Sequence, residues 1–399
     1  MRAVTAPRIG DGGARVHRVG GRNQTRYAED GMFSLLSRCA LGLLTFGFLS
    51  TGCTPQTSTG GVVKLKDMNA SADGDDVTDG GSSEDGGKTN DLGTSGRHWT
   101  DVSFPIVPDA GNLWSAFSDG ADTVVVAGDY GRILKSTKHS AFTEDTSLKP
   151  AMPALLSVSG VGPLAANQPL YVAGLGGALW KYSSGNFVDA TGAWAPDAPQ
   201  TGNSLYAVWV ASDGTAFAVG DAVAIKRSST GWAVINGPVA MEAGYALWGT
   251  GSGASVSVYA VGAAGKIWHS TGGDFTPQTS GTTNALYGVW GAAANDIYAV
   301  GDVGTILHST GDGTWTAQNA GVNLNALEGI GGASAGEIYV VGDPDKSGKS
   351  VLLHKLVAKS DIWFRETLAD AADTRHYFGV SVTPSDIYVV GDTGAILHK

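Results

Sequence analysis

The sequence predicts an all-β fold, a seven-bladed β-propeller of four-stranded blades, closed by an N-terminal strand that completes the last blade. First, a small residue followed by glycine recurs seven times at intervals of 39 to 49 residues, the period of a propeller blade. Second, each copy divides into short segments rich in β-branched and aromatic residues and bounded by Gly or Asp turns. Third, glycine makes up 59 of the 399 residues without a three-residue period, which excludes collagen and indicates many tight turns.

Composition limits the classes of function. Hydrophobic residues make up 42% of the chain, enough for a large core, and the hydrophobic residues do not form a series of membrane-spanning segments. The formal net charge of −11 repels phosphate backbones, and the Trp-containing region has no cluster of Lys and Arg. We therefore expect no nucleic-acid partner.

The first 52 residues divide into two segments. Residues 1–31 contain six Arg against three acidic residues and no apolar periodicity, so we interpret them as an upstream extension or a misassigned start without a fold of its own. Residues 32–52 contain Arg38, an apolar run from Cys39 to Leu49, and then small residues. That run is too short to span a membrane and has the length of the apolar part of a secretory signal.

The small residues that lead into Cys53 resemble a bacterial lipobox. The resemblance implies that the signal is removed, that Cys53 is acylated, and that the protein is anchored by lipid at the envelope of a bacterium. Ser50 stands where that family usually has Leu. An ordinary signal peptide with an incidental cysteine is the alternative. Since Cys39 would leave with the signal, the exported domain is expected to contain no disulfide.

Residues 53–96 are rich in Gly, Ser, Thr and Asp and contain no aromatic residue. Such a segment cannot offset its ordering entropy by burial, so we predict a flexible acidic tether. The spacing of Asp73 and Asp75 resembles part of a calcium loop, but no closing Glu follows at the twelfth position.

Residues 97–399 form the predicted propeller, with strands a to d in each blade. The clearest copy runs from Leu286 to Trp315. An aromatic residue begins strand d in six copies: Phe142, Phe187, Trp232, Phe275, Trp315 and Trp363. The chain stops after strand c of the last copy, so we predict that the segment around Trp99 supplies its strand d and removes the exposed strand edge.

The turns and the segment Ser309-Thr-Gly-Asp-Gly-Thr-Trp315 resemble those of Asp-box (BNR-type) repeat propellers, and within them the photosystem II stability/assembly-factor-like group. The Asp-box pattern is only approximated, since Asp312 is one place late. The group includes both sialidases and non-enzymatic scaffolds, so the resemblance implies the fold and no particular activity. Kelch-type propellers are the alternative, disfavoured because strand b mostly ends in Gly-Asp.

Two recurring positions and one loop contain residues that could form a site. Strand c carries a cationic or imidazole residue at one fixed place: Lys135, Lys181, Lys226, His269, His308, His354 and His398. Equivalent positions in a ring lie too far apart to share a metal ion, so we interpret them as structural repeats and predict no metal site and no cofactor. The Asp that follows the strand-b glycine is interpreted as a turn residue. Residues 342–350 resemble a phosphate loop with one residue too many, and we favour an extended hairpin loop over a weak cation site.

No catalytic set is evident in the sequence. A sialidase-like site needs three arginines with a Tyr, Glu and Asp, and the exported region has only five arginines, none placed near strand a in three blades. We therefore predict a non-enzymatic, monomeric binding or scaffolding module with a protein or glycan partner. A sialidase-like hydrolase and a purely structural lipoprotein are the alternatives.

The predicted binding face consists of the d–a and b–c loops, which emerge on one side of a propeller and vary most in this sequence. Trp194 is predicted to lie in the long d–a connection from Val188 to Asn203, exposed as an anchor or folded over the blade rim. The elongated b–c turn of blade six adds Asp345, Lys346 and Lys349, and the d–a connection before the last blade is predicted to offer Arg365, Arg375 and His376.

Overall fold

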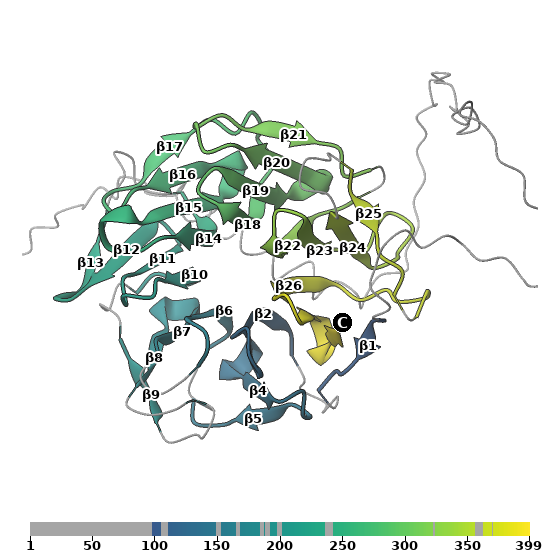
Figure 1. Cartoon of the computed structure of the whole chain (residues 1–399), viewed down its shortest axis with the longest axis horizontal. Coiled ribbons are helices and arrows are strands. Elements are labelled where there is room, and N and C mark those ends of the chain that lie inside the picture. Colours follow the sequence, from purple (N-terminus) through teal and green to yellow (C-terminus); the bar gives the residue numbers. More distant parts are fainter. Residues whose placement is uncertain are drawn as a thin grey trace, which may run out of the picture.

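The computed structural model describes residues 98–399 apart from 105–110, 149–152, 165–167, 184–186, 188–191, 198–201, 236–241, 322–323, 356–361 and 369. Within these residues the chain forms a ring of seven antiparallel four-stranded sheets, with the inner strands toward the centre (Figure 1). The predicted extension (1–31), the signal (32–52), Cys53 and the tether (53–96) lie outside the described residues. No helix in the described part of the chain is long and apolar enough to cross a membrane.

The first four blades follow chain order from strand a, the inner strand, to strand d, the outer strand. Blade one consists of β2 (Leu113–Ser118), β3 (Thr123–Gly128), β4 (Ile133–Thr137) and β5 (Thr143–Asp145). Blade two consists of β6 (Leu155–Gly160), β7 (Leu170–Gly174), β8 (Leu179–Ser183) and β9 (Ala193–Pro196). Blade three consists of β10 (Leu205–Val210), β11 (Ala216–Gly220), β12 (Val223–Ser228) and β13 (Gly231–Val234). Blade four consists of β14 (Gly244–Thr250), β15 (Ser257–Gly262), β16 (Ile267–Ser270) and β17 (Thr276–Gln278).

The last three blades complete the ring. Blade five consists of β18 (Leu286–Ala293), β19 (Asp296–Gly301), β20 (Thr305–Ser309) and β21 (Thr316–Gln318). Blade six consists of β22 (Leu327–Ser334), β23 (Glu337–Gly342), β24 (Val351–Lys355) and β25 (Phe364–Arg365). Blade seven consists of β26 (Tyr377–Val382), β27 (Ile387–Gly391), β28 (Ile396–His398) and, from the other end of the domain, β1 (Thr100–Asp101).

The recurring glycine at the end of strand b is required by a close approach to the start of strand a. A Cβ built on Gly301 would lie 2.0 Å from the carbonyl oxygen of Ala285, and one on Gly220 would lie 1.8 Å from that of Ser204. Any side chain there would collide with backbone, so the repeat spacing records a steric constraint. The turn that follows is also tight, with Val303 at φ 57° and Gly304 at φ 66° in blade five. The glycine of this turn, Gly304, therefore supplies a backbone conformation that other residues rarely adopt.

The core is divided among the interfaces between blades. The buried apolar residues of the described chain form seven clusters, each shared by two neighbouring blades. An aromatic residue on strand b meets the strand-d aromatic of the next blade edge-to-face at six interfaces, with ring centroids 6.0 to 6.2 Å apart. The pairs are Tyr171–Trp232, Phe217–Phe275, Tyr259–Trp315, Tyr298–Trp363, Tyr339–Trp99 and Tyr388–Phe142. Each blade is therefore stabilised mainly by its neighbours.

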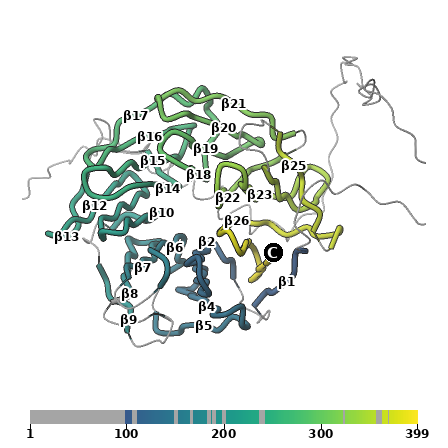
Figure 2. The backbone as a smooth tube through the Cα atoms, viewed as in Figure 1, coloured from purple at the N-terminus to yellow at the C-terminus, as the bar shows by residue number. Residues whose placement is uncertain are grey.

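The ring closes where β1 lies beside the C-terminal strand, as the tube in Figure 2 shows. Thr100 pairs with His398 and Asp101 with Leu397. Trp99 is 5% exposed and donates its indole N–H to Glu366 Oε2 at 3.1 Å. The Lys399 ammonium contacts the same carboxylate oxygen at 2.9 Å. These contacts join the two ends of the domain to blade six.

One predicted strand is misplaced. Phe187 was expected to begin strand d of blade two, but that strand is β9 (Ala193–Pro196). Phe187 lies before it in the chain, 4% exposed, with its ring 5.3 Å from Lys135 Nζ and 5.0 Å from the Tyr182 ring. The prediction failed because Phe187 fills the aromatic site between blades without belonging to the outer strand.

Candidate functional site: the channel mouth

The centre of the propeller is lined by the inner strands, which surround a cavity of about 230 Å³. The second residue of each inner strand lines this cavity; we call these seven residues the channel ring. The channel ring consists of Trp114, Leu156, Tyr206, Tyr245, Tyr287, Glu328 and Phe378. Five of the seven are aromatic, and the cavity-lining residues include Glu328 but no Lys or Arg.

The aromatic side chains of the channel ring contact one another in two groups. Tyr245 lies between Tyr206 and Tyr287, with centroid distances of 5.7 and 5.6 Å. Trp114 lies against Phe378 with their centroids 4.6 Å apart. These contacts hold π faces and phenol groups at fixed places around the channel.

A carboxylate follows strand b in five blades, and we call these groups the turn carboxylates: Asp129, Asp221, Asp302, Asp343 and Asp392. Several of them bond to residues of the channel or beside it. Asp129 Oδ1 accepts the indole N–H of Trp114 at 2.7 Å, and Asp302 Oδ2 accepts the hydroxyl of Tyr287 at 3.2 Å. The sequence interpretation of these residues as turn formers missed this second role. The channel ring and the turn carboxylates together form the channel mouth.

The electrostatics of the channel mouth keep its tyrosine phenols protonated. Burial, followed by the charge of Asp221, raises the pKa of Tyr206 to about 12. Burial and the charges of Asp221 and Asp302 also raise the pKa of Tyr245. The Asp392 carboxyl has a pKa raised by burial, and its Oδ1 is a buried atom without a hydrogen-bond partner. The mouth thus offers acceptors and π faces to a ligand that carries donors or positive charge.

Apolar side chains also project from the b–c turns. Tyr130, which follows Asp129, is 61% exposed, and Val303, which follows Asp302, is 70% exposed. Both residues have positive φ, at 59° and 57°. Large exposed hydrophobic residues on a rigid turn beside a cavity are typical of a binding surface.

The structure brings together several of the candidates predicted in blade six. Arg365 Nη1 contacts Asp345 Oδ2 at 2.5 Å, and Nη2 donates to the carbonyls of Lys349 and Ser350 at 3.0 and 2.6 Å. Hydrogen bonds hold the pKa of the Asp345 carboxyl far below its usual range, and the bond from the Ser347 hydroxyl has the largest effect. Arg365 therefore ties down the extended b–c turn, while Lys346 and Lys349 are exposed there. The predicted extended hairpin loop is present between β23 and β24.

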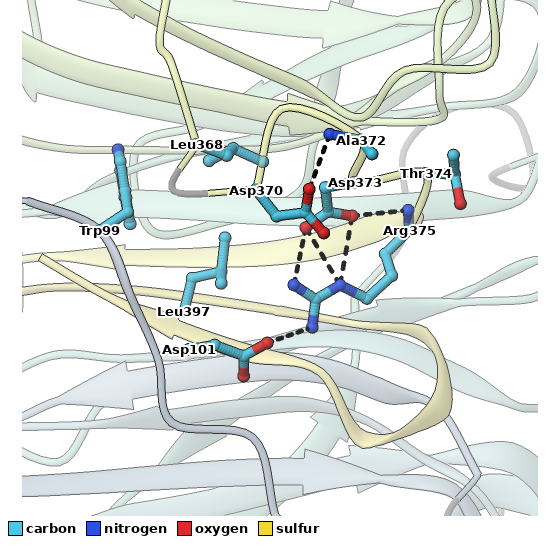
Figure 3. A pocket seen from close by; sticks show the side chains of 9 residues that line it. All are labelled: Trp99, Asp101, Leu368, Asp370, Ala372, Asp373, Thr374, Arg375 and Leu397. Carbon is cyan, nitrogen blue, oxygen red and sulfur yellow. Dashed lines mark hydrogen bonds and ion pairs between the residues drawn. The ribbon is translucent and has the colours of Figure 1, made fainter.

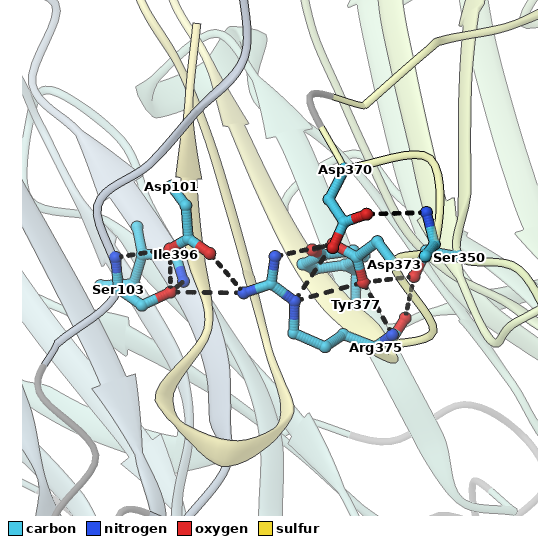
Figure 4. Close-up of polar contacts among 9 residues, drawn as sticks. Asp101, Ser103, Ser350, Asp370, Asp373, Arg375, Tyr377 and Ile396 are labelled. Atoms are coloured by element: carbon cyan, nitrogen blue, oxygen red, sulfur yellow. Dashed lines mark hydrogen bonds and ion pairs between the residues drawn. The ribbon is translucent and has the colours of Figure 1, made fainter.

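Arg375 lies at the closure of the ring, beside a pocket of about 330 Å³ (Figure 3). Its guanidinium donates one hydrogen bond to Oδ1 of Asp373 and two to Oδ2, the shortest 2.6 Å from Nη2 to Oδ2, and its Nη1 lies 2.8 Å from Asp101 Oδ2. Asp373 also accepts the hydroxyls of Ser350 and Tyr377, each at 2.8 Å (Figure 4). Burial alone would raise the pKa of Asp373, but these hydrogen bonds hold it at about 2. Two carboxylates, from Asp101 beside the C-terminal strand and from Asp373 before β26, thus hold Arg375 across the seam where the ring closes.

His376, the next residue, lies beside the channel mouth. Its Nδ1 lies 2.9 Å from Oδ1 of Asp343, the turn carboxylate of blade six. That hydrogen bond raises the pKa of His376. The structure therefore separates the two neighbours: Arg375 faces the seam, and His376 faces a turn carboxylate.

Trp194 lies elsewhere. It was predicted to lie in the d–a connection of blade two, but it belongs to the outer strand β9 and is 7% exposed. Its indole N–H donates to Asp145 Oδ2 of blade one at 3.1 Å, and its ring lies edge-on to Tyr182. The prediction of an exposed anchor is wrong, because Trp194 fills the interface between blades one and two, as the alternative of a folded-back Trp allowed.

Sequence reasoning overlooked the channel ring. The signal was present, because Leu113-Trp, Leu205-Tyr, Leu286-Tyr and Tyr377-Phe recur at the start of strand a. The first residue of each pair is fully buried and the second lines the channel. Neighbouring residues of a strand point to opposite sides, so an aromatic residue that follows a core residue in several blades indicates a ring of aromatic side chains around the central channel.

Comparisons with known proteins agree on the fold. No family model and no curated protein matches the sequence. Among solved structures, "YCF48 bound to D1 peptide" is 14% identical, with a TM-score of 0.59, and the match covers 76% of this chain and 96% of that one. "Streptogramin B lyase structure" is 12% identical, with a TM-score of 0.59, covering 75% and 96%. The WD40 β-propeller domain of Doa1 is 10% identical, with a TM-score of 0.56, covering 72% and 92%. The chain is therefore similar to propellers of different functions.

Proposed function

We propose that this protein is a non-enzymatic binding module that takes a basic segment of a protein partner at the channel mouth. The observation that carries the proposal is the aromatic channel ring beside the turn carboxylates, in a cavity whose lining includes Glu328 and no Lys or Arg. A Lys or Arg side chain over a tyrosine face gains about 0.5–2 kcal/mol, and more where carboxylates are near.

The neighbours support a binding role in outline. YCF48 is a propeller of similar fold whose structure holds a D1 peptide. The lyase neighbour is the argument for an enzyme, but an overall likeness at 12% identity carries the fold alone. We favour peptide binding over catalysis because the channel mouth presents aromatic faces and a carboxylate, Glu328, that suit a basic segment.

We propose further that the protein is exported and anchored by lipid at the envelope of a bacterium. The support comes from the sequence: the apolar run before Cys53, the small residues leading into it, and the acidic segment that would separate the anchor from the propeller. In this arrangement the tether presents the channel mouth to partners in the envelope.

A matched pair of charge variants tests the binding proposal. Fluorescein-labelled peptides that alternate Gly with Lys and Arg, or Gly with Glu, are titrated against the full chain at 150 mM salt, with anisotropy as the readout. Asp221→Asn changes the mouth, whereas Asp122→Asn removes the same charge from an exposed residue in the a–b turn of blade one.

We expect the basic peptide to bind and the acidic one not to bind. Asp221→Asn and Tyr245→Leu should each weaken binding at least about fivefold, while Asp122→Asn should stay within about twofold. Equal losses in Asp221→Asn and Asp122→Asn would show attraction to overall negative charge and would contradict a site at the mouth.

A further inference from the structure

We propose that His139, Asp386 and His398 form a site for a divalent transition-metal ion, such as Zn²⁺, that joins blade one to blade seven. One ligand atom from each residue lies within 4.8 Å of the others, the one such group of three in the described chain. The site lies away from the channel mouth, at the a–b and c–d turns. It is independent of the proposed peptide binding.

The three side chains come from separate elements. His139 lies in the turn between β4 and β5 of blade one, Asp386 directly precedes β27, and His398 ends β28. Lys138 and His139 both have positive φ, 52° and 55°, and this tight turn carries the His139 ring toward blade seven. The His139 and His398 rings are stacked with centroids 5.5 Å apart.

The distances suit a shared ion. His398 Nε2 lies 2.9 Å from Asp386 Oδ1, and His139 Nδ1 lies 3.5 Å from the same oxygen. Metal–ligand bonds of about 2.0–2.1 Å at tetrahedral or octahedral angles place ligand atoms about 2.8–3.4 Å apart. Two imidazoles and one carboxylate are donors that favour Zn²⁺ and its transition-metal neighbours over Ca²⁺ or Mg²⁺.

The surroundings orient two of the three ligands. Asp386 has a side chain only 9% exposed, and its Oδ2 accepts the Ser385 hydroxyl at 2.6 Å. The His398 ring stacks on Tyr388 with centroids 4.4 Å apart. His139 is 49% exposed, so further positions on the ion would face water. A fixed carboxylate and a fixed imidazole with one exposed imidazole form a site that is open to solvent.

Blade five shows what makes blade seven different. There His308 Nε2 lies 2.8 Å from Asp296 Oδ1, and its ring stacks on Tyr298 with centroids 4.4 Å apart, the same arrangement as His398, Asp386 and Tyr388. Among the described residues, no third ligand joins that pair. The His–Asp pair is therefore the structural repeat, and His139 converts one copy into a metal site. The sequence alone argues against a metal ion shared by strand-c histidines, and from it we predict no metal site. The site proposed here differs because its second imidazole, His139, comes from a turn.

The test uses this built-in control. ZnCl₂ is titrated by calorimetry into the full chain with Cys39 and Cys53 alkylated, so that their thiols do not bind the metal. His139→Asn removes an exposed ligand and keeps a residue type that tolerates positive φ. His308→Asn removes a histidine from the matching pair in blade five. Circular dichroism verifies that each variant is folded.

We expect one Zn²⁺ per wild-type chain, at least about 30-fold weaker affinity in His139→Asn, and affinity within twofold of wild type in His308→Asn. Zn²⁺ should also raise the unfolding temperature of wild type and His308→Asn but not of His139→Asn. Equal affinity in wild type and His139→Asn, a loss in His308→Asn as large as in His139→Asn, or no binding by wild type at 1 mM Zn²⁺ would each overturn the proposal.

Discussion

Replacing Trp99 tests how the ring is closed. Trp99 is 5% exposed, lies edge-on to Tyr339 at 6.1 Å, and donates to Glu366, with Lys399 Nζ 5.5 Å from its ring. Truncating a buried Trp to Ala costs about 3–5 kcal/mol. The short strand β1 would then be held by little more than its backbone pairing with β28, so Trp99→Ala should both destabilise the domain and release its N-terminal strand.

Trp363 provides a close control. It is 8% exposed, lies edge-on to Tyr298 at 6.1 Å, donates to Gln318 at 3.0 Å, and lies 5.9 Å from Lys355 Nζ. It thus makes the same set of contacts in blade six, where strands a to d are continuous in sequence. Trp363→Ala should lose a similar free energy of unfolding without freeing a chain end.

Urea denaturation measures the free energy, and brief proteolysis followed by mass spectrometry locates the cuts. We expect both variants to lose about 3–5 kcal/mol and only Trp99→Ala to gain rapid cleavage near residue 100. A loss below about 1 kcal/mol in Trp99→Ala, or equal cleavage near residue 100 in both variants, would refute closure by the N-terminal strand.

Three further predictions concern the clasp that Trp99 and Lys399 form around Glu366, the blade-two interface and the lipid anchor. Burial raises the pKa of Glu366, but hydrogen bonds from His354, Lys399 and Trp99 hold this pKa at about 2, against an ordinary value of 4.5. The ionised carboxylate therefore contributes about 3 kcal/mol to the free energy of unfolding. This contribution is complete above pH 4.5 and is lost as the pH falls toward 2. Glu366→Gln should lower stability at pH 7 and flatten that acid dependence in urea titrations, and an unchanged slope would contradict the clasp. Trp194→Ala should lower stability by about 3–5 kcal/mol, and a melting temperature equal to wild type would contradict its packing role. Cys53→Ser should release the protein from membranes or leave it unprocessed, and wild-type protein in the aqueous phase of a detergent extraction would exclude the lipid anchor.

The sequence predicts the ring because blades repeat the same steric requirement. Gly301 and its equivalents must lack a side chain, so the period survives where other residues vary. The strand-d aromatics other than Phe187 could be found because each fills the same site between two blades, and Trp99 could be assigned to the last blade because that copy lacked one. The notable failure was Trp194, whose place in β9 depends on how the long segment of blade two folds back.

The candidate site was less accessible from sequence. Arg365 and Asp345 could be assigned to one face, but their ion pair depends on the path of the turn between β23 and β24. Arg375 looks like a free cation in the sequence, and its two carboxylate partners lie 2 and 274 residues away. Likewise, no spacing rule joins His139 to His398, because a ring brings the first and last blades together only after it closes.

The most direct test of the proposed function is site-specific photo-crosslinking from the channel mouth. A photoreactive phenylalanine analogue replaces Tyr245 in the full chain, and the exposed Asp122 position serves as the control on the opposite face. Mass spectrometry identifies the crosslinked segment after irradiation in intact cells. We expect position 245, and not position 122, to crosslink to a peptide segment rich in Lys and Arg. Crosslinks of the same segment from both positions, or crosslinks from position 245 only to acidic or neutral segments, would contradict a mouth that binds basic peptides.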